Sequence, residues 1–121
     1  MGTQKFRKLN VWHKSMDFVE DIYKLTTNFP AKELYGLTSQ LRRAATSIAL
    51  NIAEGSGAGS QLEFRRYLTM ALRSNYELMC GMEIARRVQY CTETNMNHVL
   101  KQSDEISAML TGLKNKLIAD S

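Results

Sequence analysis

Apolar residues recur three and four positions apart along four stretches of this 121-residue chain, and this spacing constrains the fold more than any other feature. Each stretch is expected to form an α-helix with one apolar face, which must pack against the other helices to leave water. The chain carries no strand signal, and its short connections favour antiparallel neighbours. The sequence therefore predicts an all-α protein, an antiparallel up-down-up-down four-helix bundle.

Capping residues and the single proline set the expected bounds of the first two helices. The first helix begins at Asn10, a good N-cap, and ends at about Asn28, because Pro30 disfavours helical geometry in the residue before it. The second helix begins after Gly36 and ends at residues 54–55, where Gly55 is the expected left-handed C-cap.

The last two helices are expected to be longer. Ser60 and Glu63 have the spacing of a capping box, which opens a third helix that can run to about Tyr90. The fourth begins near Thr94 and continues as a seven-residue apolar repeat, which favours packing at a shallow crossing angle. Asn75 interrupts the apolar stripe of the third helix, and we expect it in or near the core as a polar group that restricts how the helices align.

The first helix has a broad apolar stripe that should face the core. Trp12 begins this stripe, so its ring is expected to be largely buried. The stripe consists of Trp12, Met16, Val19 and Tyr23, widened by Phe18, Ile22 and Leu25.

The length fits one domain, with a basic N-terminal segment at residues 1–9 and the bundle at residues 10–121. The formal charge of +4 and the isoelectric point of about 9.2 permit nucleic acid or an acidic protein surface as partner without requiring either. No run approaches the roughly 20 apolar residues that span a bilayer, and the N-terminus lacks the apolar stretch of a secretory signal. We therefore expect a cytoplasmic protein with no membrane partner.

The sequence contains no recognisable catalytic or metal site. His13 and His98 are isolated, and one carboxylate, Asp17, four residues after His13 is usually a surface contact. The glycines of residues 55–59 lack the lysine and Ser/Thr of a phosphate-binding loop and follow a helix instead of a strand. The sequence thus predicts a protein that is not an enzyme and needs no cofactor or metal.

The second helix carries two surfaces that its apolar stripe does not explain. One is a narrow polar stripe, which is either a solvated shoulder or a semi-buried hydrogen-bond network that fixes how helices or subunits meet. It consists of Gln40, Arg43, Ser47, Asn51 and Glu54. The other is the face opposite the core, which has no charge between Arg43 and Glu54 and therefore indicates contact with another subunit. Its residues are Ser39, Thr46, Leu50 and Ala53.

Basic residues gather in the N-terminal segment and along the third helix. Arginine favours phosphate and carboxylate partners, so one interpretation is phosphate binding. The other is ion pairing within the third helix, which would join Arg66 to Glu63, Arg73 to Glu77, and Arg86 or Arg87 to Glu83. The candidate nucleic-acid-binding residues are Lys5, Arg7, Lys8, Arg65, Arg66, Arg73, Arg86 and Arg87.

An ordered series of motifs covers nearly the whole chain. It consists of residues 9–12 (LNVW), Phe29-Pro30 with Glu33, residues 35–44 (YGLTSQLRRA), Ser47-Ile48 and residues 51–55 (NIAEG), continues to Glu77 and fades after Met82. This series resembles the bacterial four-helix-bundle family encoded by intervening sequences in large-subunit ribosomal RNA genes. The chain departs from the family pattern at Ala49-Leu50, where a proline and a small polar residue are common, and at Met79, where a second glutamate is usual.

The resemblance implies a four-helix protomer and a ring-shaped homopentamer. A related branch comprises the accessory proteins of diversity-generating retroelements, which are basic pentamers that bind a reverse transcriptase and nucleic acid. Together with the arginines, this favours a non-enzymatic homo-oligomer that binds RNA or DNA through a basic surface. The alternative is an adaptor or scaffold ring that binds an acidic protein or a reverse transcriptase without direct nucleic-acid contact.

Overall fold

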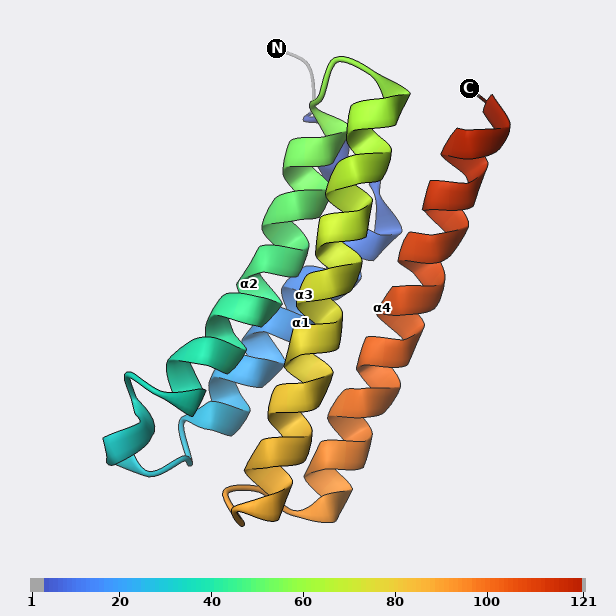
Figure 1. Cartoon of the computed structure of the whole chain (residues 1–121). Coiled ribbons are helices and arrows are strands. Elements are labelled where there is room, and N and C mark those ends of the chain that lie inside the picture. The colour runs from blue at the N-terminus through green and yellow to red at the C-terminus, as the bar shows by residue number, and fades with distance from the viewer. Residues whose placement is uncertain (1–3, 121) are drawn as a thin grey trace.

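The computed structural model of the chain describes residues 4–120, and these residues form four α-helices with no strand among them (Figure 1). The helices are α1 (Asn10–Thr26), α2 (Leu37–Ser56), α3 (Gln61–Arg87) and α4 (Glu93–Asp120). Two short 3₁₀ turns, η1 (Lys5–Lys8) and η2 (Ala31–Glu33), precede α1 and α2. The predicted all-α four-helix bundle is confirmed, and consecutive helices run in opposite directions along it (Figure 1).

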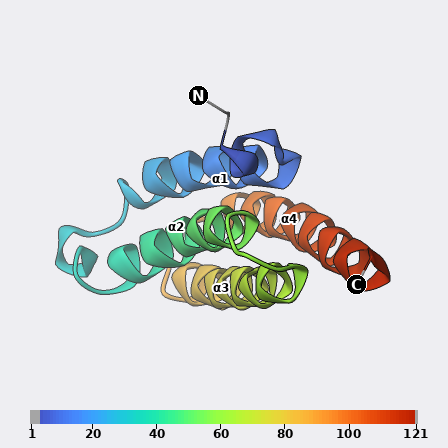
Figure 2. The ribbon, with the colours of Figure 1, turned by 90° about the horizontal axis from the view of Figure 1, so that it is seen from above.

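α2 lies between α1 and α3, and α4 packs mainly on α3 (Figure 2). Side-chain contacts show which residues of α2 and α3 lie at the same height along the bundle axis. Ser74 Oγ donates to Ser47 Oγ (2.9 Å), and Leu41 lies against Gly81 at the far end of both helices. Each step toward the end of α2 is therefore matched by a step toward the start of α3, as an antiparallel pair requires.

The core is formed by apolar side chains from all four helices, and it includes Asn75, which is fully buried as predicted. Asn75 Nδ2 donates to the Ser103 carbonyl oxygen and to Ser107 Oγ, at 2.8 Å each. These bonds join α3 to α4. Asn75 Oδ1 and Ser103 Oγ are buried at the same place, with no hydrogen-bond partner within the described part of the chain.

The predicted core face of α1 is wrong by part of a turn. Trp12 is only half-buried, and Met16 and Tyr23 are 40% and 45% exposed. Ser15 and Thr26 are buried instead, because their hydroxyls donate to the carbonyl oxygens four residues earlier, both at 2.7 Å. A satisfied hydroxyl can enter a core without losing a hydrogen bond. The buried side of α1 consists of Val11, Ser15, Phe18, Ile22 and Thr26.

Helix starts agree with the sequence to within a few residues, but the capping differs. Asn10 is the first residue of α1 and caps nothing, since Leu9 precedes the helix in an extended conformation. At α3 the predicted cap is present, because the Glu63 N–H donates to Ser60 Oγ (3.1 Å). The carboxylate of Glu63 bonds Arg66 (2.8 Å), so half of the expected capping box forms.

Gly55 does not cap α2 as predicted, but lies buried inside the helix, which ends at Ser56. Its role is close packing. A Cβ at Gly55 would lie 2.7 Å from Tyr67 Cβ and 2.9 Å from Phe64 Cδ1, distances that real Cβ atoms do not adopt. Glycine therefore lets the last turn of α2 approach the first turns of α3.

Glu33 ties together the two loops at one end of the bundle. Its carboxylate accepts a hydrogen bond from the Leu37 N–H at the start of α2 (3.0 Å) and another from the Tyr90 hydroxyl (2.8 Å). These two donors hold the pKa of Glu33 below its usual range, and the Tyr90 pKa is raised in turn. The connection before α2 is thus fixed to the connection after α3.

Among residues 4–120, no helix combines the length and apolar character needed to cross a membrane. The same residues contain no group of three or more metal-ligating side chains.

Candidate nucleic-acid interface and subunit surface

The N-terminal basic segment packs on the bundle. Phe6 lies edge-on to Trp12, with ring centroids 4.7 Å apart. The next residue of α1, His13, approaches the Arg7 carbonyl oxygen with Nε2 at 2.6 Å, which requires Nε2 to carry the proton. These two contacts hold the exposed cations Lys5, Arg7 and Lys8 beside the start of α1.

Two further groups of cations lie at the same end of the bundle. The α2–α3 connection places Arg65 and Arg66 there, and α4 runs back to the same end with Lys114 and Lys116 in its last turns (Figure 1). Among the described side chains, the carboxylates that belong to this end by position are Glu54 and Glu63, fewer than the cations. We call this surface the basic end, and it consists of Lys5, Arg7, Lys8, Arg65, Arg66, Lys114 and Lys116.

Arg65 is the most unusual cation of the basic end. Its side chain is half-buried, and its Nε is shielded from water without a hydrogen-bond partner among the described residues. Arg66 behaves differently, because it pairs with Glu63 at 2.8 Å, which is one of the ion pairs the sequence left open. Because the Nε–H of Arg65 is shielded from water, an added anion could reach only the other N–H groups of this guanidinium.

The other predicted phosphate ligands do not join the basic end. Arg73 is two turns further along α3, and Arg87 lies roughly 30 Å from Arg66 at the helical rise of 1.5 Å per residue. Arg86 is half-buried near Cys91, where burial raises the pKa of the thiol and the guanidinium opposes that shift. The eight candidates therefore fall into two separate groups, with Arg73 alone between them near the middle of α3. Sequence reasoning missed Lys114 and Lys116, although the alternating helix direction indicates where α4 must end.

The polar stripe of α2 is divided between hydrogen bonding and solvent. Asn51 Nδ2 donates to the carbonyl oxygen and to Oγ of Ser47 (2.9 and 3.0 Å), and Ser47 also accepts from Ser74 on α3. Gln40, Arg43 and Glu54 are exposed. The network is thus local to the centre of the α2–α3 contact, and Arg43 is a solvent-facing cation.

The outward face of α2 borders an apolar groove with α1. Leu50 is 55% exposed, and Thr46 and Ala53 beside it are half-buried, whereas Ser39 lies near the start of the helix. Trp12, Met16 and Val19, three of the α1 side chains that were expected in the core, complete this groove of about 310 Å³. Its walls are Phe6, Trp12, Met16, Val19, Thr46, Ala49, Leu50 and Ala53.

Comparison with known proteins places this geometry in a wider group. Residues 7–112 match the family described as 23S rRNA-intervening sequence protein. The chain is also similar to a protein of unknown function from the S23 ribosomal protein family of Bacteroides thetaiotaomicron VPI-5482, whose crystal structure has 1.70 Å resolution. The two are 29% identical, with a TM-score of 0.77, and the match covers 86% of this chain and 97% of the other. No curated protein matches the chain.

Proposed function

The chain belongs to the 23S rRNA-intervening sequence protein family, and we propose that it is a non-enzymatic homo-oligomer that binds nucleic acid, in particular RNA, through its basic end. The observation that carries the proposal is the convergence of cations from η1, the start of α3 and the end of α4 on one end of the bundle (Figure 1). The family description refers to 23S rRNA, which makes RNA the first ligand to test.

The chemistry of the basic end suits phosphate more than base edges. Its cations are long and mostly solvent-facing, and only Arg65 and Lys114 are half-buried. Phosphate contacts give affinity and position but little sequence information. Binding is therefore expected to tolerate sequence variation and to weaken steeply with salt, because each neutralised phosphate releases condensed counterions.

Self-assembly would turn a modest charge into a strong field. Leu50 and the apolar groove beside it are the support for assembly, since monomers rarely leave such a surface open. The family resemblance implies five subunits, and five chains at +4 each carry +20. Basic ends repeated around an assembly attract a polyanion more strongly than one chain does.

The binding test compares two double charge reversals that change the net charge equally. Arg65→Glu/Arg66→Glu is expected to weaken RNA binding at least about ten-fold and to make the salt dependence shallower by about one to two units of slope. The control, Arg86→Glu/Arg87→Glu, lies at the other end of α3 and is expected to change affinity much less. Fluorescence anisotropy with a single-stranded RNA, at two salt concentrations, measures both quantities.

The outcome of that titration can contradict the proposal in two ways. If the wild-type oligomer binds neither RNA nor DNA at about 50 mM salt, where electrostatic attraction is least screened, the nucleic-acid function is wrong. If both double variants weaken binding equally, the effect is one of net charge, and the basic end is not the site.

The assembly test uses Leu50→Glu, which places a charge in the proposed contact. Such a charge is expected to weaken association because it would be buried without a partner. Leu62→Glu is the matched control, since Leu62 is 63% exposed on α3, away from the α1–α2 groove. Light scattering should give a mass well above one chain of 13.8 kDa for wild type and control. A monomeric wild type would contradict assembly.

A second candidate function is supported by the connection before α2. Leu34 is 48% exposed and Tyr35 is 94% exposed, so two large apolar side chains face solvent on one loop. Exposed aromatic residues are common anchors of protein contacts. If nucleic-acid binding is absent, we propose an adaptor that uses this loop to bind a protein such as a reverse transcriptase, and Tyr35→Ser is expected to weaken that binding in a titration with the purified enzyme.

A further inference from the structure

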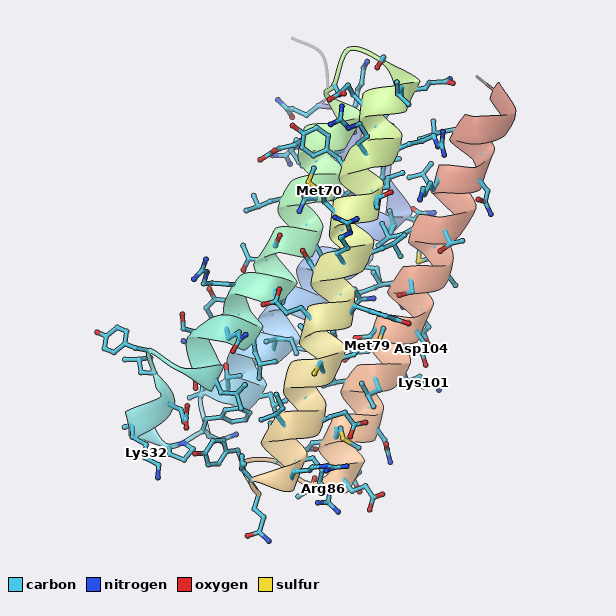
Figure 3. The ribbon with its side chains drawn as sticks, in the orientation of Figure 1. Lys32, Met70, Met79, Arg86, Lys101 and Asp104 are labelled. Carbon is cyan, nitrogen blue, oxygen red and sulfur yellow. The ribbon has the colours of Figure 1, made fainter. Side chains whose placement is uncertain are left out.

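A second groove, of about 420 Å³, lies between α3 and α4. Its floor is apolar, with Met79 and Leu100 half-buried and Tyr76 76% exposed. Asp104 borders it from α4 and lies close to Met79 in Figure 3. The remaining members are Cys80 and Glu83, both exposed.

The groove has an acidic rim on a basic protein. Neither Glu83 nor Asp104 takes part in an ion pair or hydrogen bond among the side chains that the structure describes. An apolar surface bordered by two free carboxylates selects a partner that presents a cation beside apolar groups.

We propose that this groove receives the outward face of α2 from a second copy of the chain, with Arg43 of one copy between Glu83 and Asp104 of the next. The proposal rests on the self-assembly proposed above and names the surface that the α2 face meets.

The outward face of α2 has the matching chemistry. Arg43 is exposed and has no ion-pair partner among the described side chains, and no carboxylate follows it before Glu54. Its neighbour Arg42 is already engaged, because its guanidinium stacks on Tyr23 at 4.6 Å and its Nε donates to Thr26. Arg43 is therefore a cation without an ion pair at the edge of this face, where Glu77 of its own α3 borders the same pocket, and the exposed Leu50 follows two turns later.

The height of Arg43 along the bundle axis also matches the heights of the groove residues Glu83 and Asp104. Ser47 faces Ser74 and Leu41 faces Gly81, so Arg43 is level with about residues 78–79 of α3. Glu83 lies about one turn to one side of that level.

Asp104 lies about one turn to the other side, because Asn75 bonds the carbonyl oxygen of the preceding residue, Ser103. When two chains stand side by side with parallel axes, Arg43 of one is thus at a height between the two carboxylates of the other.

The two surfaces differ and lie on opposite sides of the chain, with α2 on the left and the α3–α4 pair on the right in Figure 1. A contact between unlike surfaces leaves one of each free, so that further copies add until a ring closes. Because the axes stay parallel, every basic end points the same way. This arrangement explains how assembly and polyanion binding can support each other.

The first test is a charge swap. Arg43→Glu alone, and Glu83→Lys/Asp104→Lys together, are each expected to weaken association at least about ten-fold, because each brings like charges together. The variant with all three substitutions restores one charge between two opposite charges and is expected to recover most of the assembly. Sedimentation velocity measures association, circular dichroism checks folding, and Arg87→Glu and Asp17→Lys serve as matched reversals elsewhere.

The second test uses the native thiol in the groove, so that it does not depend on charge variants that assemble poorly. In Arg43→Cys the new thiol would lie near Cys80 of the adjacent copy, and copper-phenanthroline oxidation in air should join the two as an intermolecular disulfide. Covalent dimers and higher species are expected on a non-reducing gel, and Arg43→Cys/Cys80→Ser should give none.

The results separate this inference from the proposed assembly itself. A monomeric wild type contradicts both. An assembled wild type that neither single-sided charge reversal weakens, or an Arg43→Cys protein that forms no cross-link through Cys80, contradicts only the pairing of these two surfaces. Failure of the three-substitution variant to recover, with folding intact, also rules out the direct pairing.

Discussion

The α2–α3 contact and the α3–α4 contact are built on different principles. At the first, Gly55 packs so closely that a Cβ there would lie 2.7 Å from Tyr67 Cβ. At the second, Asn75 bonds α4, but its own Oδ1 and the hydroxyl of Ser103 have no partner, and an apolar groove of about 420 Å³ lies alongside. At Gly55 the first contact has no room for a side chain, whereas the second is bordered by an apolar groove and holds two polar atoms without a partner among the described residues.

This difference explains why sequence motifs are specific in one part of the chain and generic in another. Close approach of two helices needs a particular small residue at a particular place, such as Gly55 in α2. A seven-residue apolar repeat, as in α4, only requires side chains of roughly the right size. The motif series accordingly fades after Met82, before α4 begins at Glu93.

The largest expected effect compares one buried side chain from each contact. Ile48 on α2 and Leu110 on α4 are both fully buried. Truncation of such a residue to alanine costs about 2–5 kcal/mol, and the cost is greatest where neighbours cannot collapse into the cavity. Ile48→Ala is therefore expected in the upper half of that range and Leu110→Ala in the lower half. Urea unfolding at equal protein concentration measures both.

If Ile48→Ala and Leu110→Ala lowered the free energy of unfolding equally, the α2–α3 contact would be no more rigid than the α3–α4 contact. A larger loss for Leu110→Ala would reverse the expected order. Equal protein concentration matters here, because dissociation of an oligomer adds a concentration-dependent term to the measured stability.

A smaller effect sharpens the account of the α2–α3 contact, since its two glycines are not equivalent. Gly55→Ala would push against Tyr67 Cβ, which is fixed to the backbone, and is expected to cost about 1–3 kcal/mol. Gly81→Ala would meet the flexible end of Leu41 at 2.6 Å, and the better helix propensity of alanine offsets up to about 1 kcal/mol. Thermal unfolding should rank Gly55→Ala clearly below Gly81→Ala, and the opposite order would contradict the close-packing argument.

The four helices could be predicted because helical spacing and caps depend on residues close together in the sequence. The rotation of α1 about its axis could not be predicted, because burial depends on contacts with distant parts of the chain. Ser15 and Thr26 lie in the core because their hydroxyls donate to carbonyl oxygens of their own helix. The pattern of apolar residues in the sequence cannot indicate such buried polar positions. The part of the predicted stripe at Trp12 and Met16 therefore lies outside the buried side of α1, whereas Phe18 and Ile22 are buried as predicted. That misplaced part of the stripe is informative, because its side chains line an open groove with Leu50.

The candidate site was predictable only in part for a related reason. Sequence reasoning grouped the arginines of α3 because they are close in the chain, although Arg66 and Arg87 are at opposite ends of a 27-residue helix. It left Lys114 and Lys116 out of the candidate site, although the antiparallel fold brings the end of α4 to the same end of the bundle as η1. Which cations share one end of the bundle depends on the direction and length of each helix. Their order along the chain does not show this grouping.

The smallest expected effect tests the α3–α4 contact directly. Asn75→Leu removes two hydrogen bonds and also removes an oxygen that is buried without a partner among the described residues. The half-buried Ser107 hydroxyl that loses a donor can turn to water. We therefore expect the change to be nearly neutral or to stabilise by up to about 1 kcal/mol. The bonds to Ser103 and Ser107 also fix the position of α4 along α3, so their loss is expected to speed amide hydrogen exchange throughout α4. Ser103→Ala is the control, because it removes the unpartnered hydroxyl and keeps both bonds from Asn75. Slower or unchanged exchange in Asn75→Leu, or a stability loss well above about 1 kcal/mol, would mean that packing alone positions α4 and that the asparagine stabilises the fold.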